Sequence, residues 1–133
     1  KYFAEHPYDD AKILLNLNYD MISRDDADDE LGVKCGMVYT QKYEILETLA
    51  KTHNEEYELG LDISYKPSER PRGGSDHSSF SAKDIPVFYF MAGFPPEYHQ
   101  TNDHISKINF EKMTKIIKVG YLNIWELANT EWQ

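Results

Sequence analysis

The chain has 133 residues, which is the length of one ordinary domain or of part of a larger one. Apolar residues make up 41% and aromatic residues 14% of it, enough to build a packed core, so the composition excludes intrinsic disorder. The net charge of −9, from 14 basic and 23 acidic residues, disfavours nucleic acid as a partner. No apolar run approaches the roughly 18 residues of a membrane span.

The first third of the chain predicts two strands separated by an acidic loop. Residues 12–23 begin with an apolar run and continue with partial alternation, a pattern that fits a buried strand. The segment DDADDE, residues 25–30, predicts a solvated loop, with calcium binding as the weaker alternative. Residues 33–39, VKCGMVY, predict a second, short strand.

The middle of the chain predicts a helix, a strand and a long loop. A helix is expected from Thr40 to about His53, because apolar residues recur there at helical spacing. Residues 58–65 alternate with a period of two, which predicts a strand with Leu59, Leu61 and Ile63 on one side. Two prolines and two glycines mark residues 66–75 as a loop.

The last third predicts a buried strand and a long helix. Residues 85–93, IPVFYFMAG, are continuously apolar and end in glycine. Asn109 is expected to cap a helix over 110–128. The expected apolar stripe of this helix consists of Met113, Ile116, Ile117, Tyr121, Ile124, Leu127 and Ala128. Strands that alternate with helices in this way predict a layered α/β fold.

Three groups of polar residues lie at the ends of predicted strands or in loops that lead to helices. Asp20 ends the first strand, Tyr98 and His99 follow the last one, and Asp76 and His77 lie in the glycine-rich segment GGSDHSSF. In open α/β sheets, ligands bind in the crevice outside the carboxyl ends of the strands. These residues are therefore the candidates for a functional site.

Each candidate also has a purely structural interpretation. Asp20 is equally suited to capping a turn, and Asp76 to capping a helix beside an exposed His77 imidazole. A single histidine in a loop, such as His99, is more commonly a surface hydrogen-bonding residue than a metal ligand. Neither HExxH nor a CxxC pair occurs, so spacing alone gives no strong zinc signal.

Taken together and in order, the motifs resemble the second half of the co-catalytic zinc aminopeptidase family. The matching segments are NYDMISR, GGSDHSSF, IPVFYFMAG, EYHQTNDHISKINFEKM and the helix ending in ELAN, within residues 12–129. That family includes bacterial secreted aminopeptidases and, more distantly, glutamate carboxypeptidases and glutaminyl cyclases. The resemblance implies part of a three-layer α/β/α fold with a mixed sheet.

The resemblance also implies roles for individual residues. Asp20 corresponds to a ligand of one zinc ion and His99 to a ligand of the other. Tyr98 is similar to a tyrosine that hydrogen-bonds the tetrahedral oxyanion in several members. Asp76 corresponds to an aspartate that supports the rim of the active site, and in the cyclases takes part in a catalytic hydrogen-bond network.

The chemistry of the family explains these residue types. Two zinc ions lower the pKa of a bridging water and polarise the scissile carbonyl, and a carboxylate base transfers the proton to the leaving amine. A zinc-bound histidine needs a further acceptor to fix its tautomer. For His99, either Asp103 or Glu97 is expected to be that acceptor.

The first half of the family pattern has no counterpart in this chain. That half supplies a further histidine ligand, a bridging aspartate and an adjacent Glu-Glu pair, and no matching segment precedes residue 12. The pair Glu55-Glu56 lies downstream, in a predicted helix, and is not a substitute. Because tetrahedral zinc needs three or four protein ligands, or three and a water, one ligand per ion does not hold a stable site. We expect residues 1–133 to be the C-terminal part of a zinc peptidase domain that neither retains zinc nor acts alone.

The expected function is therefore that of a fragment of a zinc-dependent exopeptidase that removes N-terminal residues from peptides. Two alternatives remain, a glutaminyl cyclase-like acyltransferase that uses one zinc and a non-catalytic peptidase-like binding domain. An incomplete sheet would leave an exposed strand edge, which favours self-association. The resemblance further implies a secreted or periplasmic protein.

Overall fold

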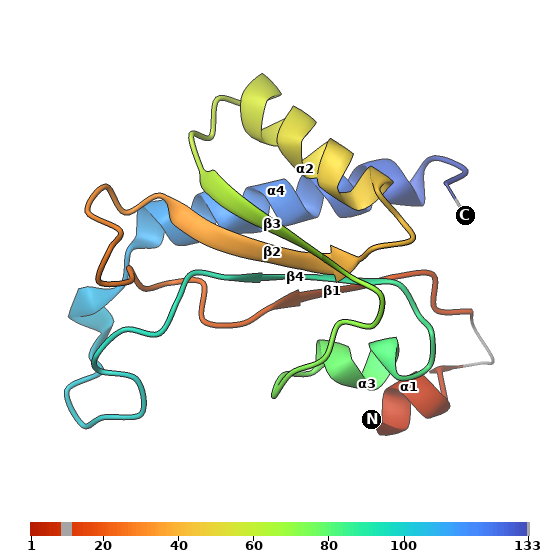
Figure 1. The fold of residues 1–133 in the computed structure, drawn as a ribbon, viewed down its shortest axis with the longest axis horizontal. Coiled ribbons are helices and arrows are strands. Elements are labelled where there is room, and N and C mark those ends of the chain that lie inside the picture. Colours follow the sequence, from red (N-terminus) through yellow and green to blue (C-terminus); the bar gives the residue numbers. More distant parts are fainter. Residues whose placement is uncertain (9–11, 133) are drawn as a thin grey trace.

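Four strands form one mixed sheet in the computed structural model, which describes residues 1–8 and 12–132. Their order is β1-β4-β2-β3 (Figure 1). β1 pairs in parallel with β4, β2 pairs in parallel with β3, and the central β2–β4 pair is antiparallel. The mixed sheet predicted from the resemblance is thus confirmed. The strands are β1 (Asn16–Tyr19), β2 (Lys34–Thr40), β3 (Asp62–Ser68) and β4 (Val87–Met91).

Helices lie on both sides of the sheet, as the layered prediction required (Figure 1). The long helices α2 (Ile45–Glu56) and α4 (Phe110–Ala128) cover one face, and the short helices α1 (Tyr2–Glu5) and α3 (His77–Ser81) lie on the other side. A 3-10 turn, η2 (Ile105–Lys107), precedes α4. Among the described residues, no helix is long and apolar enough to cross a membrane.

The third strand differs from its prediction. β3 begins at Asp62 and continues to Ser68, so the first residues of the predicted loop belong to the sheet. The reason is the parallel register with β2, which pairs Lys34 with Asp62 and Thr40 with Ser68. Leu59 and Leu61 are buried as expected, but they precede the strand.

The core lies between the sheet and the two long helices. Alternate residues of β2 and β4 point toward α2 and α4, and the helices contribute aliphatic side chains to the same layer. The close contact of β1 with α4 depends on Gly120, because a Cβ there would lie 2.2 Å from the Tyr19 hydroxyl. That hydroxyl donates to the carbonyl of Ile117 at 3.0 Å. The main buried side chains are Met37, Tyr39, Leu46, Ala50, Phe88, Phe90, Ile116, Val119 and Leu127.

Helix α4 begins where the sequence predicts, but its buried face is rotated relative to the expected stripe. The Asn109 side chain accepts from the Lys112 backbone N–H, as a capping residue should. Ile117 and Tyr121 are 42% and 58% exposed, whereas Lys112 and Asn123 are fully buried. Asn123 is satisfied there, since it hydrogen-bonds the His53 ring at 2.8 Å and donates to the Leu46 carbonyl at 3.1 Å. Ile116 and Leu127 of the expected stripe are buried, so packing against the sheet and α2 shifts the buried face from the predicted one and does not replace it.

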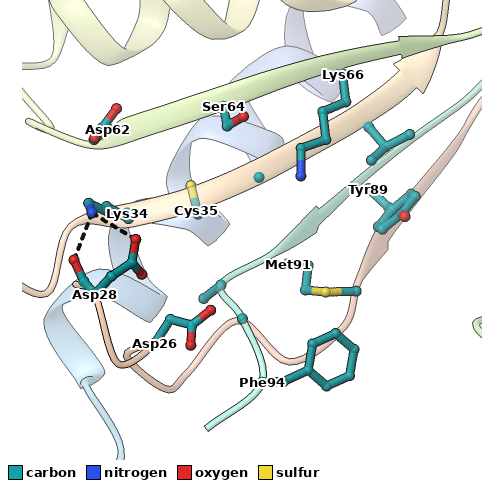
Figure 2. Close-up of a pocket in the computed structure, with 14 residues that line it drawn as sticks. Asp26, Asp28, Lys34, Cys35, Asp62, Ser64, Lys66, Tyr89, Met91 and Phe94 are labelled. Carbon is teal, nitrogen blue, oxygen red and sulfur yellow. Dashed lines mark hydrogen bonds and ion pairs between the residues drawn. The ribbon is translucent and has the colours of Figure 1, made fainter.

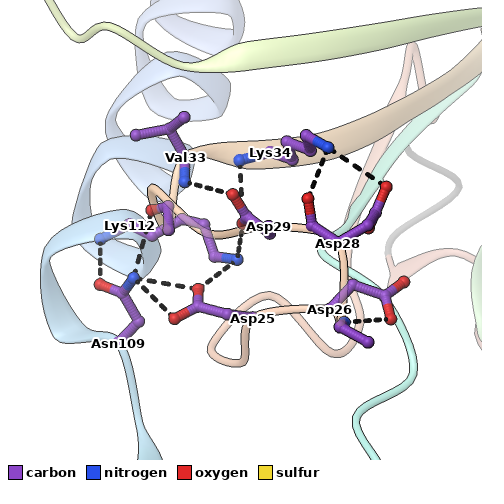
Figure 3. Close-up of polar contacts among 10 residues, drawn as sticks. Asp25, Asp26, Asp28, Asp29, Val33, Lys34, Asn109 and Lys112 are labelled. Atoms are coloured by element: carbon purple, nitrogen blue, oxygen red, sulfur yellow. Dashed lines mark hydrogen bonds and ion pairs between the residues drawn. The ribbon is translucent and has the colours of Figure 1, made fainter.

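The acidic segment is not simply a solvated loop. The Lys112 ammonium lies 2.9 Å from Asp29 and 2.6 Å from Asp25, and the side chains of Lys112 and Asp29 are both 0% exposed (Figure 3). Asp29 also accepts from the backbone N–H groups of Val33 and Lys34. The prediction of a solvated loop was wrong for this part of the segment, because α4 carries a buried cation into it.

The face of the sheet that points away from α2 and α4 is only partly covered. α3 packs on it near Tyr89, and the rest forms a shallow hollow of about 410 Å³ (Figure 2). Its lining mixes polar and apolar side chains and includes none of the four site residues expected from the sequence. The side chains that line the hollow from the strands include Ser64, Lys66, Tyr89 and Met91.

Candidate functional site

Asp20 lies at the carboxyl end of β1, next to the point where β4 also ends. Its backbone N–H donates to the Phe90 carbonyl at 3.1 Å, and one residue later the Met21 carbonyl accepts from Ala92 at 3.0 Å. Because β1 and β4 are parallel neighbours, the chain leaves both strands at the same edge of the sheet. Asp20 and the loop that carries Tyr98 and His99 therefore emerge side by side, as predicted from the strand ends.

Tyr98 and His99 form a stacked pair in the loop after β4. Their ring centroids are 3.9 Å apart at an interplanar angle of 25°, and Phe94 meets the Tyr98 ring edge-on at 5.2 Å. Tyr98 is 39% exposed and His99 is also exposed. His99 has a φ of +57°, a left-handed conformation that is uncommon for a residue with a side chain.

A pocket of about 470 Å³ opens between this loop and the segment that follows Asp20. Met21, Ser23 and Arg24 line it from the β1 side, and Tyr98 and His99 line it from the loop. Both the phenol and the imidazole are thus presented to one hollow at the carboxyl edge of the sheet. This is the concave surface that a ligand-binding site requires.

The structure of the segment GGSDHSSF does not match the interpretation of Asp76 as a helix cap beside an exposed His77. Asp76 precedes α3 and is exposed, but its side chain makes no capping hydrogen bond. His77 was expected to be exposed and is instead 1% exposed. Its ring stacks on Tyr89 with centroids 3.9 Å apart, and its Nδ1 lies 3.4 Å from the Asn18 amide. The Nε2 atom of His77 is buried and has no hydrogen-bond partner among the described residues.

The charges around His77 show which candidates the fold brings together. Burial lowers the pKa of His77, while the nearby carboxylates of Asp20 and Asp76 act in the opposite direction. Burial also raises the pKa of Tyr89, and Asp20 adds to that increase. The buried imidazole therefore lies close to both acidic candidates. Its burial was missed from sequence, because it arises from stacking on a strand that is distant along the chain.

The two acceptors expected for His99 have a different partner. Arg24 donates from Nη2 to Glu97 at 2.8 Å and from Nη1 to Asp103. Glu97 also binds Lys107, and the hydrogen bond from Lys107 is the main cause that lowers the pKa of Glu97. The prediction that Glu97 or Asp103 orients His99 receives no support from these contacts. The sequence signal for Arg24 was its position four residues after Asp20, in NYDMISR.

The donor set does not complete a metal centre. Within residues 1–8 and 12–132, no group of three or more His, Cys, Asp and Glu side chains is arranged to hold a metal ion. Calcium binding by residues 25–30 gains no support either, since the Lys112 ammonium lies between the carboxylates of Asp25 and Asp29. The described residues thus supply individual candidate zinc ligands but no complete zinc-binding group.

The mixed sheet, its helical layers and the pocket at the carboxyl edge define a layered α/β domain with a pocket just beyond its strands. Its family follows from a direct match. The model of peptidase family M28 matches residues 1–122, and the chain belongs to this family. The resemblance to zinc aminopeptidases described above is thereby confirmed.

Several solved structures that share this fold are aminopeptidases. LapA aminopeptidase from Legionella pneumophila aligns with a TM-score of 0.71 at 22% identity, over 98% of this chain and 34% of its own. A zinc aminopeptidase from Bacillus subtilis gives 0.68 at 19% identity, over 98% and 33%. The aminopeptidase from Aneurinibacillus sp. strain AM-1 gives 0.62 at 24% identity, over 85% and 25%.

This chain therefore spans about a third of the length of the LapA and Bacillus subtilis chains. At these identities, the likeness establishes the fold alone. A comparison with curated protein sequences gives no significant match.

Proposed function

We propose that residues 1–133 form the C-terminal part of a zinc-dependent exopeptidase domain that removes N-terminal residues from peptides. The observation that carries the proposal is the match to peptidase family M28 over residues 1–122, on a fold shared with aminopeptidases. Membership of a peptidase family supports peptides as substrates. The parallel β1–β4 pair adds a structural reason, because it directs Asp20 and the loop of His99 to one edge.

Within this proposal, Asp20 and His99 are ligands of different zinc ions. Tyr98 supplies a phenol to the oxyanion of the substrate, which is supported by its exposure beside the pocket. Asp76 supports the rim of the site, in keeping with its effect on the buried His77. The remaining ligands and the general base come from another part of the domain, since the described residues hold no complete metal-binding group. We further propose, from the resemblance alone, that the protein is exported.

The isolated chain is expected to bind zinc more weakly than about 1 μM, because each ion would receive one side chain where about three are needed. Calorimetric titration of the 133-residue chain with zinc chloride measures this. Binding below 1 μM that is lost in Asp20→Asn would contradict the fragment proposal.

The exopeptidase proposal itself is tested on a longer protein that contains these residues. Such a protein is expected to cleave a peptide with a free N-terminus and to leave the N-acetylated peptide intact, as measured by mass spectrometry. Equal cleavage of both peptides would exclude an exopeptidase.

We also infer that the isolated chain pairs with a second copy through the outer edge of β1. Hydrogen bonds of Asn16 and Asp20 face β4, so by alternation the backbone groups of Leu17 and Tyr19 face outward. Beside this edge, α4 exposes a stripe of Ile117, Tyr121 and Trp125, of which Trp125 is 60% exposed. An unpaired strand next to an apolar helix face is a typical surface for pairing.

The other edge of the sheet is less suited to pairing. In β3, the Asp62 N–H faces β2, so by alternation Pro67 occupies an outward position. Proline has no N–H to donate, and charged residues adjoin it at Lys66 and Glu69. Proline and charges are features by which natural proteins prevent edge pairing.

The double variant Tyr121→Lys/Trp125→Lys is therefore expected to shift the chain from dimer to monomer in analytical ultracentrifugation. Placing two charges on the stripe opposes its burial between copies. Leu31→Lys is the matched control, because Leu31 is 85% exposed and precedes β2, an inner strand that does not pair with β1. A chain that is monomeric at all concentrations, or a double variant that remains dimeric, would refute the inference.

A further inference from the structure

Arg24 connects two segments of the candidate site that are far apart in the sequence. It follows Asp20 by four residues, and its guanidinium spans Glu97 and Asp103, one on either side of the Tyr98–His99 pair. The side chains of Arg24 and Glu97 are only 11% and 17% exposed. A charge pair this shielded is less weakened by water than a surface pair, and the planar guanidinium fork suits two carboxylates at once.

The loop beyond Glu97 has little else to hold it. Residues 98–107 are all exposed, so burial contributes little to their position. The other polar and ring contacts of this loop are largely internal, such as Lys107 with Glu97 and Phe94 with Tyr98. A segment with few buried contacts normally opens with a low free-energy cost. The bonds from Arg24 therefore stand out as the tie between this loop and the segment that follows Asp20.

The backbone on both sides of this tie is strained. Met21 and His99 have φ values of +56° and +57°, and they are two of the four non-glycine residues with positive φ among those described. Such conformations carry an energetic cost and persist only where the surroundings impose them. Because the loop is exposed, packing does not impose the positive φ of His99. The contacts of Arg24 on both sides of His99 do provide a constraint.

We propose that Arg24 is a positioning residue, which holds the Tyr98–His99 pair beside Asp20 and keeps His99 in its left-handed conformation. The roles of Tyr98 and His99 rest on the function proposed above, whereas the clamp itself rests only on the geometry. Methionine at position 24 fills similar space without charge and should release the loop. Lysine keeps the charge but lacks the rigid fork, so it should restore the loop only in part.

The test uses NMR on the 133-residue chain and compares Arg24→Met with Arg70→Met. Arg70 is the matched control, because it pairs with Asp84 at 2.8 Å on the surface, and Asp84 precedes β4 whereas the loop follows it. In Arg24→Met, we expect a weaker intraresidue HN–Hα NOE at His99, the signature of its positive φ. We also expect amide exchange of Gln100, which donates to Glu97, to rise at least about tenfold.

Arg24→Lys should give intermediate values for both signals, and Arg70→Met should change neither. Global stability is followed separately by urea unfolding, so that a general loss of structure is not mistaken for release of the loop. If Arg24→Met does not fold, Glu97→Gln and Asp103→Asn each remove one arm and should each raise the Gln100 exchange rate. The proposal would be overturned if the His99 NOE and the Gln100 exchange rate are unchanged in Arg24→Met. It would also be overturned if the Gln100 exchange rate is unchanged in both Glu97→Gln and Asp103→Asn. The outcome is independent of peptide hydrolysis, so the clamp and the exopeptidase function can fail separately.

Discussion

Replacing Lys112 by methionine is expected to lower the free energy of unfolding by about 3–5 kcal/mol. The Lys112 ammonium is buried between Asp29 and Asp25, and the Asp29 side chain is 0% exposed (Figure 3). Methionine fills similar space but leaves the Asp29 carboxylate buried without its cation. The remaining donors, the N–H groups of Val33 and Lys34, offset only part of that cost.

Urea unfolding of Lys112→Met measures this effect, and Lys115→Met is its control. Lys115 lies on the same helix and pairs with Glu111, whose side chain is 79% exposed, so its loss should change stability by less than about 0.5 kcal/mol. A loss below about 1 kcal/mol in Lys112→Met would show that water or local rearrangement solvates Asp29.

The same cluster predicts how stability depends on pH. Burial raises the pKa of Asp29, but the hydrogen bond from Lys112 and the backbone N–H groups outweigh it, so the net pKa is lowered. A carboxyl with a lower pKa in the folded state stabilises the fold above its unfolded pKa of about 3.9. That contribution is lost as the pH falls from there through the folded value. Lys112→Met should therefore lose less stability on acidification than the unmodified chain.

Replacing His99 by alanine is expected to lower peptide hydrolysis by more than about a hundredfold in a longer protein that contains this chain. Loss of an outer partner of a metal ligand typically costs about 10–100-fold, and loss of the ligand itself should cost more. The zinc content of the purified protein should fall as well, which gives a readout besides activity. Both are measured on the same preparation, by a peptidase assay and by elemental analysis.

His6→Ala is the control for this experiment. His6 follows α1 and is exposed, and α1 lies at the opposite end of the sheet from the loop that follows β4 (Figure 1). Its replacement should leave hydrolysis and zinc content unchanged. Full activity in His99→Ala would remove His99 from the set of zinc ligands, although the family of the chain would stand.

Some of the site could be found from the sequence because it depends on local order. Asp20 follows an apolar strand and His99 follows another, and strands β1 and β4 are found there, each shorter than the predicted segment. The capping role of Asn109 was also predicted correctly, since a cap involves only the next turn. The parallel β1–β4 pairing then places the two strand ends at one edge.

The sequence by itself determined most of the elements, their order and the motifs that identify the family, because each depends on neighbours a few residues away. The start of the first long helix was predicted wrongly, since Thr40 belongs to β2 and α2 begins at Ile45. Only the tertiary structure decided the partners of the buried polar groups. Arg24 meets Asp103 across 79 residues, Lys112 meets Asp29 across 83, and His77 stacks on Tyr89 from a different element. Hydrophobic periodicity does not encode such pairs, since a charge or an imidazole is buried only where the fold provides a partner.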